Sequence, residues 1–161
     1  MLHKRKLTKT IKIGGVSVGG SNPVVVQSML KNRLENQTAL LNEIAALQSC
    51  GCEIIRIAIV QENSIDTLES LIKQRAFNVP VVADIQFDYR FAIKALIAGA
   101  DCVRINPGNM PDKSGLVKVA LEAKNRNAAI VTKMPMAKVN PACIPILELE
   151  MVESAYKVFQ K

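Results

Sequence analysis

The stretch VVADIQFDYR, residues 81–90, begins as an apolar strand and ends in polar and charged side chains. The stretch CVRINPGN, residues 102–109, repeats this design with Arg104, Asn106 and a Pro-Gly turn. Charged groups inside apolar strands are expensive unless something pairs with them. Two successive strands of this kind therefore indicate a site at which their polar groups meet.

The unit of a strand followed by a helix recurs along most of the chain. A hairpin within residues 11–26 precedes it. The predicted strands cover 24–29, 53–60, 79–85, 101–107 and 128–134, and the predicted helices lie within 36–51, 63–75, 88–100 and 113–127. Asn63 or Ser64 is the expected cap of the second helix. Gly51 and Gly99 stand where the first and third helices should stop.

Apolar strands that alternate with helices predict an α/β fold with a parallel sheet. Units of roughly 20–30 residues suit both a doubly wound sheet and a (β/α)8 barrel. No Gly-x-Gly-x-x-Gly follows the first strand, and polar residues end several strands, which favours the barrel. We expect a partial (β/α)8 TIM barrel of about four to five βα units, preceded by a short β-hairpin.

The carboxyl ends of parallel strands meet at one edge of the sheet. That edge is expected to collect the following polar side chains: Gln27, Ser28, Arg56, Asp84, Gln86, Asp88, Arg104, Asn106 and Asn109. Arg56 lies between isoleucines and needs a carboxylate or a phosphate. Either Asp84, as a structural partner, or a phosphate, as a ligand, would satisfy this need of Arg56. The NPGN turn leads into a helix whose N-terminal amides favour an anion. The residues thus indicate an anion site, for a phosphate.

Composition limits the cellular compartment and the classes of partner that we expect. The 161 residues suit one domain, and the net charge of +7 is concentrated at the N-terminus, where the first twelve residues carry five basic side chains and no acid. We interpret this as a solvated basic tail without a nucleic-acid partner. No apolar run approaches the ~20 residues of a membrane span, and no signal region is present, so cytoplasm is expected. The spacing of the four cysteines does not predict a metal site.

The segments VQSM, GCEIIRIAI, VPVVADIQFDYRFAIKA and GADCVRINPGN resemble the N-terminal barrel of the 4-hydroxy-3-methylbut-2-en-1-yl diphosphate synthase family of the non-mevalonate isoprenoid pathway. The resemblance covers about residues 4–130. It implies reductive ring opening of 2-C-methyl-D-erythritol 2,4-cyclodiphosphate by a homodimeric iron–sulfur oxidoreductase, with ferredoxin or flavodoxin as electron donor. In the family a separate C-terminal domain carries a [4Fe-4S] cluster.

Carried over to this sequence, the resemblance implies that Arg56 and Arg104 grip the diphosphate. Gln27, Ser28, Asp84, Asn106 and Asn109 match rim positions of the family. Asp84, Gln86 and Asp88 are the candidate catalytic or orienting residues. Asp84 either orients a substrate hydroxyl or holds an arginine in place. Gln86 stands where the family usually has histidine, so it cannot carry a proton at neutral pH. Leu30, Lys31 and Asn32 replace a usual Thr-Asn-Thr.

The resemblance is expected to stop near Ile130, although MVESAYKVF faintly resembles a later barrel helix. We expect a basic tail over 1–10, half a TIM barrel over 11–134, a divergent segment over 135–161 with a short helix from about Leu147 to Phe159, and no cluster domain. Such a truncated chain would lack a cofactor and turnover, and a partner copy or the tail would cover its open sheet edges. A diphosphate-binding module without catalysis and a dihydropteroate-synthase-like barrel enzyme are the alternative functions.

Overall fold

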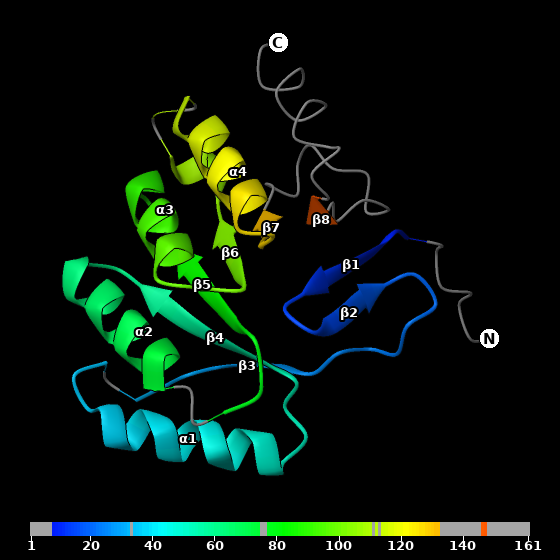
Figure 1. Cartoon of the computed structure of the whole chain (residues 1–161), viewed down its shortest axis with the longest axis vertical. Helices are drawn as coiled ribbons and strands as arrows, with labels where there is room; N and C mark the ends of the chain where they lie inside the picture. Colours follow the sequence, from blue (N-terminus) through cyan, green and yellow to red (C-terminus); the bar gives the residue numbers. More distant parts are fainter. Residues whose placement is uncertain are drawn as a thin grey trace.

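The computed structural model describes residues 8–32, 34–74, 77–110, 112, 114–132 and 146–147. The strands are β1 (Thr10–Ile13), β2 (Val16–Gly19), β3 (Gln27–Met29), β4 (Ile54–Ile59), β5 (Val81–Ile85), β6 (Cys102–Ile105), β7 (Ala129–Thr132) and β8 (Ile146–Leu147). The helices are α1 (Gln37–Ser49), α2 (Glu62–Gln74), α3 (Tyr89–Ile97) and α4 (Ser114–Asn125), with a single 3-10 turn η1 (Pro107–Asn109). Figure 1 shows these elements in order.

The main sheet has the strand order β3-β4-β5-β6-β7-β8. Its first five strands are parallel and each lies beside the next one in sequence, with β8 added antiparallel to β7. A doubly wound sheet reverses its strand order at a switch point, and this sheet does not. The predicted hairpin is also present, as β1 paired with β2. The expectation of four βα units and a fifth strand of a barrel is confirmed.

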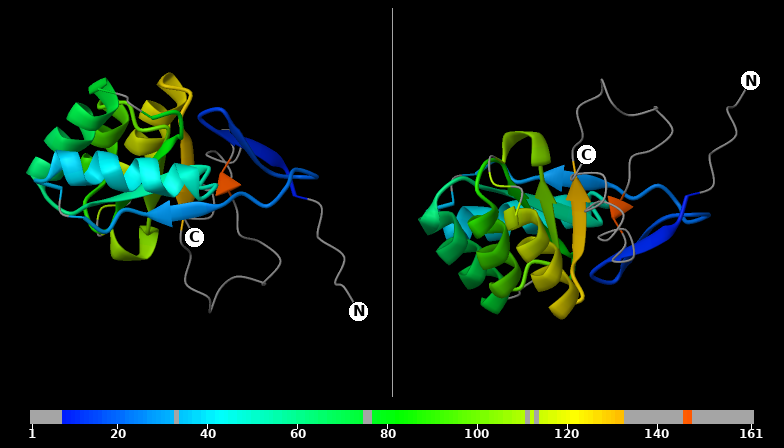
Figure 2. Two further views of the ribbon diagram at one scale, coloured as in Figure 1. Left: turned by 90° about the horizontal axis from the view of Figure 1, so that it is seen from below. Right: turned by 90° about the horizontal axis from the view of Figure 1, so that it is seen from above.

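The four helices lie on one face of the sheet and the hairpin on the other (Figures 1 and 2). Alternate residues of each strand point to the helices. On β4 these are Ile55, Ile57 and Ile59, which join Leu40 of α1 and Leu68 of α2 in the main hydrophobic core. The strict alternation leaves the intervening residues of each strand for the opposite face.

The β1–β2 hairpin covers the end of this opposite face at which the strands begin. Ile11 and Ile13 pack there against Ile54, Val82 and Cys102, one residue from each of three neighbouring strands. Burial raises the pKa of the Cys102 thiol to about 12, so this cysteine acts as a small apolar residue. The hairpin therefore forms a floor beneath the carboxyl half of the sheet.

Helix boundaries confirm most of the sequence expectations and correct one. The Asn36 side chain caps α1 by accepting from the Ala39 N–H at 3.0 Å. The prediction that Asn63 or Ser64 caps α2 is wrong, because the helix begins at Glu62 and both residues lie in its first turn. The Ser64 N–H donates to the Gln61 carbonyl at 3.1 Å, which closes the first turn earlier than expected.

The C-terminal predictions fall largely outside the described residues. The predicted strand over 128–134 is present as β7. Leu147 ends β8 instead of starting a helix, and the rest of the predicted helix to Phe159 lies outside the described residues. The pairing of β8 with β7 places a segment of the tail on one edge of the sheet, as expected for an edge that needs covering.

Candidate anion-binding site

Three charged side chains follow the hairpin floor on the same face of the sheet. Arg56 lies two residues after Ile54, Asp84 two after Val82, and Arg104 two after Cys102, so strand alternation places each charge directly beyond a floor residue. Asp84 is paired in register with Arg104 across the β5–β6 boundary. The apolar floor of the sheet is therefore followed by a charged layer, at the edge where the sequence predicted an anion site.

Asp84 joins the two arginines. Its Oδ1 accepts from Arg104 Nη1 at 2.6 Å, and its Oδ2 lies 3.3 Å from Arg56 Nε. The carboxylate is only 4% exposed, whereas the arginine side chains are 26% and 25% exposed. The buried carboxylate thus contacts both guanidiniums, and the two arginine side chains remain partly exposed.

The charges in this layer do not balance, because two guanidiniums share one carboxylate. Arg56 Nε is buried and makes no hydrogen bond of good geometry, even to Asp84. The other contact of this guanidinium is weak, with Nη2 3.9 Å from Met29 Sδ. A buried donor without a hydrogen bond is unusual in a native protein. The layer thus keeps a net positive charge, which suits an anion.

The other predicted site residues are not all part of this layer. Register pairs Ser28 with Ile55, a residue of the helix-side core, so Ser28 lies on the opposite face from Arg56. Gln27 pairs with Ile54 and lies on the hairpin face, exposed at the edge of the sheet. Gln86 and Asn109 are exposed beyond the ends of β5 and β6.

Two predicted site residues have local structural contacts. The Asp88 carboxylate caps α3 by accepting from the Arg90 N–H at 2.8 Å, and it pairs with the Arg90 guanidinium at 2.7 Å. These hydrogen bonds hold the pKa of Asp88 below its ordinary value. The Asn106 side chain accepts from the Gly108 N–H at 3.2 Å and caps the turn η1. Both residues shape the loops of the rim.

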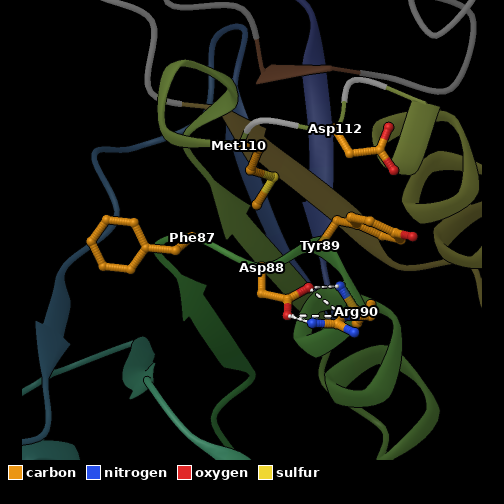
Figure 3. Close-up of a pocket in the computed structure, with 6 residues that line it drawn as sticks. All are labelled: Phe87, Asp88, Tyr89, Arg90, Met110 and Asp112. Atoms are coloured by element: carbon orange, nitrogen blue, oxygen red, sulfur yellow. Dashed lines mark hydrogen bonds and ion pairs between the residues drawn. The ribbon is translucent and has the colours of Figure 1, made fainter.

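A pocket of about 290 Å³ lies between these loops, and sequence reasoning did not single it out. It is lined by Phe87, Asp88, Tyr89, Arg90, Met110 and Asp112 (Figure 3). Asp112 accepts from the N–H and the hydroxyl of Ser114 at the start of α4, and these bonds lower its pKa. The Tyr89 ring lies so close to Gly115, in the first turn of α4, that a Cβ there would clash with it. A glycine in the first turn of a predicted helix is the sequence signal that could have indicated this contact.

The described residues do not form a metal centre. No group of three or more His, Cys, Asp or Glu side chains in the described ranges lies close enough together to hold a metal ion. Cys50 is exposed, Cys52 and Cys102 are buried, and Cys143 lies outside those ranges. These residues do not fit a [4Fe-4S] cluster, which is typically held by cysteine thiolates.

Comparison with known proteins identifies the family. Residues 8–157 match the GcpE TIM-barrel domain. The chain belongs to this family. The family match runs past Ile130, where the resemblance was expected to stop, and it includes most of MVESAYKVF, whereas the alignments with curated relatives extend over 130 residues. No helix in the described part of the chain is long and apolar enough to cross a membrane.

Curated relatives carry the name expected from the sequence. The chain is 42% identical over 130 residues to 4-hydroxy-3-methylbut-2-en-1-yl diphosphate synthase (flavodoxin) of Caldanaerobacter subterraneus, an alignment that covers 81% of this chain and 36% of the relative. It is also 42% identical over 130 residues to the enzyme of that name from Nitratidesulfovibrio vulgaris, covering 81% and 33%. The chain thus spans about a third of the length of these relatives.

Solved structures support the fold alone. Yersinia pestis dihydropteroate synthase superposes with a TM-score of 0.58 at 16% identity, over 94% of this chain and 54% of that one. A truncated 3-deoxy-D-arabino-heptulosonate 7-phosphate synthase from Thermotoga maritima gives the same score and identity, over 83% and 48%. The chain covers about half of each, in agreement with the partial barrel.

Proposed function

We propose that this chain forms the diphosphate-binding part of a 4-hydroxy-3-methylbut-2-en-1-yl diphosphate synthase, and that Arg56 and Arg104 bind the two phosphates of 2-C-methyl-D-erythritol 2,4-cyclodiphosphate. The observation that carries the proposal is the pair of guanidiniums held by one buried carboxylate at the carboxyl edge of the sheet. Family membership and the names of the relatives support the choice of substrate.

The chemistry of the layer suits a cyclic diphosphate. A guanidinium grips phosphate oxygens with two parallel hydrogen bonds, which a lysine cannot do. Asp84 keeps both arginines in place before the ligand arrives, so little reorganisation is needed when charge develops on the reacting molecule. With both carboxylate oxygens engaged by arginines, we assign Asp84 the role of holding them and not that of orienting a substrate hydroxyl.

The remaining rim residues have subsidiary roles in this proposal. Gln86, Asn106 and Asn109 would donate hydrogen bonds to the ligand from the loops, and Gln27 would do so from the sheet edge. Ser28 contributes no ligand contact, because it lies on the helix face. Asp88 orders the loop after β5 through Arg90.

In the proposed activity the whole enzyme would need two electrons, which a [4Fe-4S] cluster reduced by flavodoxin would supply. The described residues do not fit that cluster, whose ligands would come from elsewhere in the enzyme. The chain would bind the substrate and keep its phosphates in place in a homodimeric enzyme. We assign it no redox chemistry of its own.

Isothermal titration with the cyclic diphosphate tests the proposal. We expect binding by the wild-type chain and a loss of about 10- to 100-fold in affinity for Arg104→Gln, since a charge-assisted hydrogen bond contributes ~1.5–3 kcal/mol. Arg126→Gln is the matched control, because Arg126 pairs with Glu122 on α4, away from the rim.

Equal affinities for the wild type and Arg104→Gln would contradict the proposal, as would an absence of binding by the wild-type chain. Tighter binding of a pterin diphosphate would instead favour a function like that of dihydropteroate synthase. If binding is found but the assembled enzyme carrying this chain has no turnover, the chain is a binding module.

A further inference from the structure

Strand β3 forms an open edge of the main sheet. It is the first strand in the order β3-β4-β5-β6-β7-β8, and no strand in the described part of the chain lies on its other side. The Leu30 N–H donates to the Arg56 carbonyl at 2.9 Å, and the Val26 carbonyl accepts from the Ile54 N–H at 3.2 Å. The even-numbered residues of this segment therefore make the backbone hydrogen bonds to β4.

The odd-numbered residues direct their backbone groups to the open edge. Hydrogen-bonding direction alternates along a strand, so the N–H and C=O groups of Val25, Gln27 and Met29 point away from β4. Their side chains share the hairpin face of the sheet. Val25 packs against the hydrophobic cluster under the hairpin, Gln27 pairs in register with Ile54 of that cluster, and the Met29 sulfur contacts Arg56.

This edge lacks the charges and prolines with which native sheets usually protect an open edge. The segment VVVQSML, residues 24–30, contains neither a charged residue nor a proline. Val24 and Val26 are 77% and 53% exposed, although β-branched side chains favour a paired strand. An uncharged edge of this kind is suited to the addition of another strand.

We propose that β3 pairs antiparallel with β3 of a second copy of this chain, about a two-fold axis at Gln27. The segment is self-complementary in that register. Gln27 lies opposite Gln27 of the second copy, where the two side-chain amides hydrogen-bond to each other, and Val25 lies opposite Met29, an apolar pair. The outward N–H and C=O groups of all three residues find partners, and no like charges meet.

The arrangement of the sheet favours a second copy in this orientation. Strand β7 already carries β8, so two copies cannot close head to tail through β3 and β7. Pairing about a two-fold axis uses the same edge of both copies and leaves neither β3 open.

The second copy would also contribute a residue beside the charged layer. Its Val25 packs against Met29, whose sulfur lies 3.9 Å from Arg56 Nη2. An amide has two N–H donors, so each Gln27 retains one for the ligand contact proposed above. The inference goes beyond the proposed function and does not depend on it, since the arginines and Asp84 belong to one copy.

Sedimentation velocity of the 161-residue chain over a range of concentrations tests this interface. We expect a wild-type dimer that dissociates on dilution. Gln27→Glu and Gln27→Lys each place like charges opposite each other at the axis, and each should weaken dimerisation by at least about 10-fold. An equimolar mixture of the two variants should restore the dimer, because a glutamate then lies opposite a lysine. Gln61→Glu, the same change at an exposed position before α2, should leave the dimer unchanged.

Hydrogen exchange gives a readout that needs no substitution. The Gln27 and Met29 amides should be protected from exchange in the dimer and should exchange freely after dilution to the monomer. Amides that exchange freely at every concentration would overturn the proposal.

The sedimentation results have equally clear contrary outcomes. A wild-type chain that stays monomeric throughout would overturn the proposal and would leave the edge to a further strand of a closed barrel. A mixture of folded Gln27→Glu and Gln27→Lys chains that stays monomeric would show that Gln27 does not lie at the axis. Dissociation by Gln61→Glu as strong as that by Gln27→Glu would show an effect of overall charge, and either result would overturn the assignment.

Discussion

Asp84 is the residue on which the geometry of the charged layer depends. It is almost fully buried, and it contacts both arginines. A buried carboxylate with two cationic partners differs from a surface ion pair, because water cannot replace either partner without entering the sheet face. Asp84 therefore fixes the two arginines relative to each other.

Replacing this carboxylate tests its structural role. Asp84→Asn should lower the free energy of unfolding by about 1–3 kcal/mol, since two guanidiniums lose their shared partner and repel each other. Thermal unfolding followed by circular dichroism measures the loss. Pyrophosphate should raise the Tm of the variant by more than that of the wild type, because the anion replaces the missing charge. An unchanged Tm in the absence of ligand would show that Asp84 does not hold the arginines.

Sequence reasoning found the members of this layer but not their arrangement. Arg56, Asp84 and Arg104 stand out because charges inside apolar strands are costly. The same reasoning grouped Ser28 with them, although Ser28 faces the helices. A shift of one residue in register moves a side chain to the other face, and register depends on tertiary packing that local sequence does not specify. The caps made by Asp88 and Asn106 were not anticipated either.

At the scale of elements, α3 and α4 pack closely against each other at Gly115. A Cβ added to Gly115 would lie 2.2 Å from Tyr89 Cδ1. Lys118 Nζ lies 5.8 Å from the centre of the same ring, within the range of a cation–π interaction. The Tyr89 ring, at the start of α3, thus packs against the first turns of α4 beside the pocket.

Gly115→Ala should disrupt this packing. We expect the variant to lose about 1–3 kcal/mol of stability, because the Tyr89 ring must move and its neighbours with it. Chemical denaturation measures the change. Gly15→Ala is the control, since a Cβ there meets nothing within 4 Å. Equal stabilities of the two variants would mean that α4 can shift away from Tyr89 at little cost.

The loop after β3 should respond to acid. Burial acts to raise the pKa of Glu43, but hydrogen bonds from the Lys31 and Asn32 N–H groups, and the nearby Lys31 charge, outweigh it and lower the pKa below its ordinary value of 4.5. Because the folded pKa is the lower one, the stability that this carboxylate contributes is present above pH 4.5 and is lost as the pH falls through the lowered pKa.

NMR chemical shifts of the Lys31 and Asn32 amides measure this response. We expect both to titrate together with a midpoint below 4.5 and to stay constant at higher pH. In Glu43→Gln the titration should disappear. A midpoint above 4.5 in the wild type would contradict the contacts seen between Glu43 and the loop.

Element order was well predicted from the sequence, and element ends were not. Apolar runs and helical spacing gave every strand from β3 to β7 and all four helices. Strand β3 is shorter than expected because Val24 and Val26 are exposed and lie outside the ladder. The start of α2 at Glu62 follows from a turn closed at Gln61, which propensity alone does not reveal.

At the scale of the whole molecule, the described residues form half of a barrel. The β1–β2 hairpin covers one end of its sheet, and the charged layer of Arg56, Asp84 and Arg104 follows it. The hairpin closes the end where the strands begin, and the loops after β5 and β6 surround the opposite end (Figures 1 and 3). The sequence indicated the half-barrel and the hairpin, but it did not show that the hairpin packs beneath the charges. That contact joins residues about 40 to 90 positions apart in the chain and depends on the completed sheet.

The central claim is that an anion binds between Arg56 and Arg104, and side-chain NMR of the arginine Nε–H groups locates it most directly. On addition of pyrophosphate we expect the Arg56 and Arg104 signals to shift in a saturable way, because both guanidiniums are partly exposed and share one carboxylate. The signal of Arg126, paired with Glu122 on α4, should stay in place. Saturable binding that leaves Arg56 and Arg104 unchanged would contradict the account.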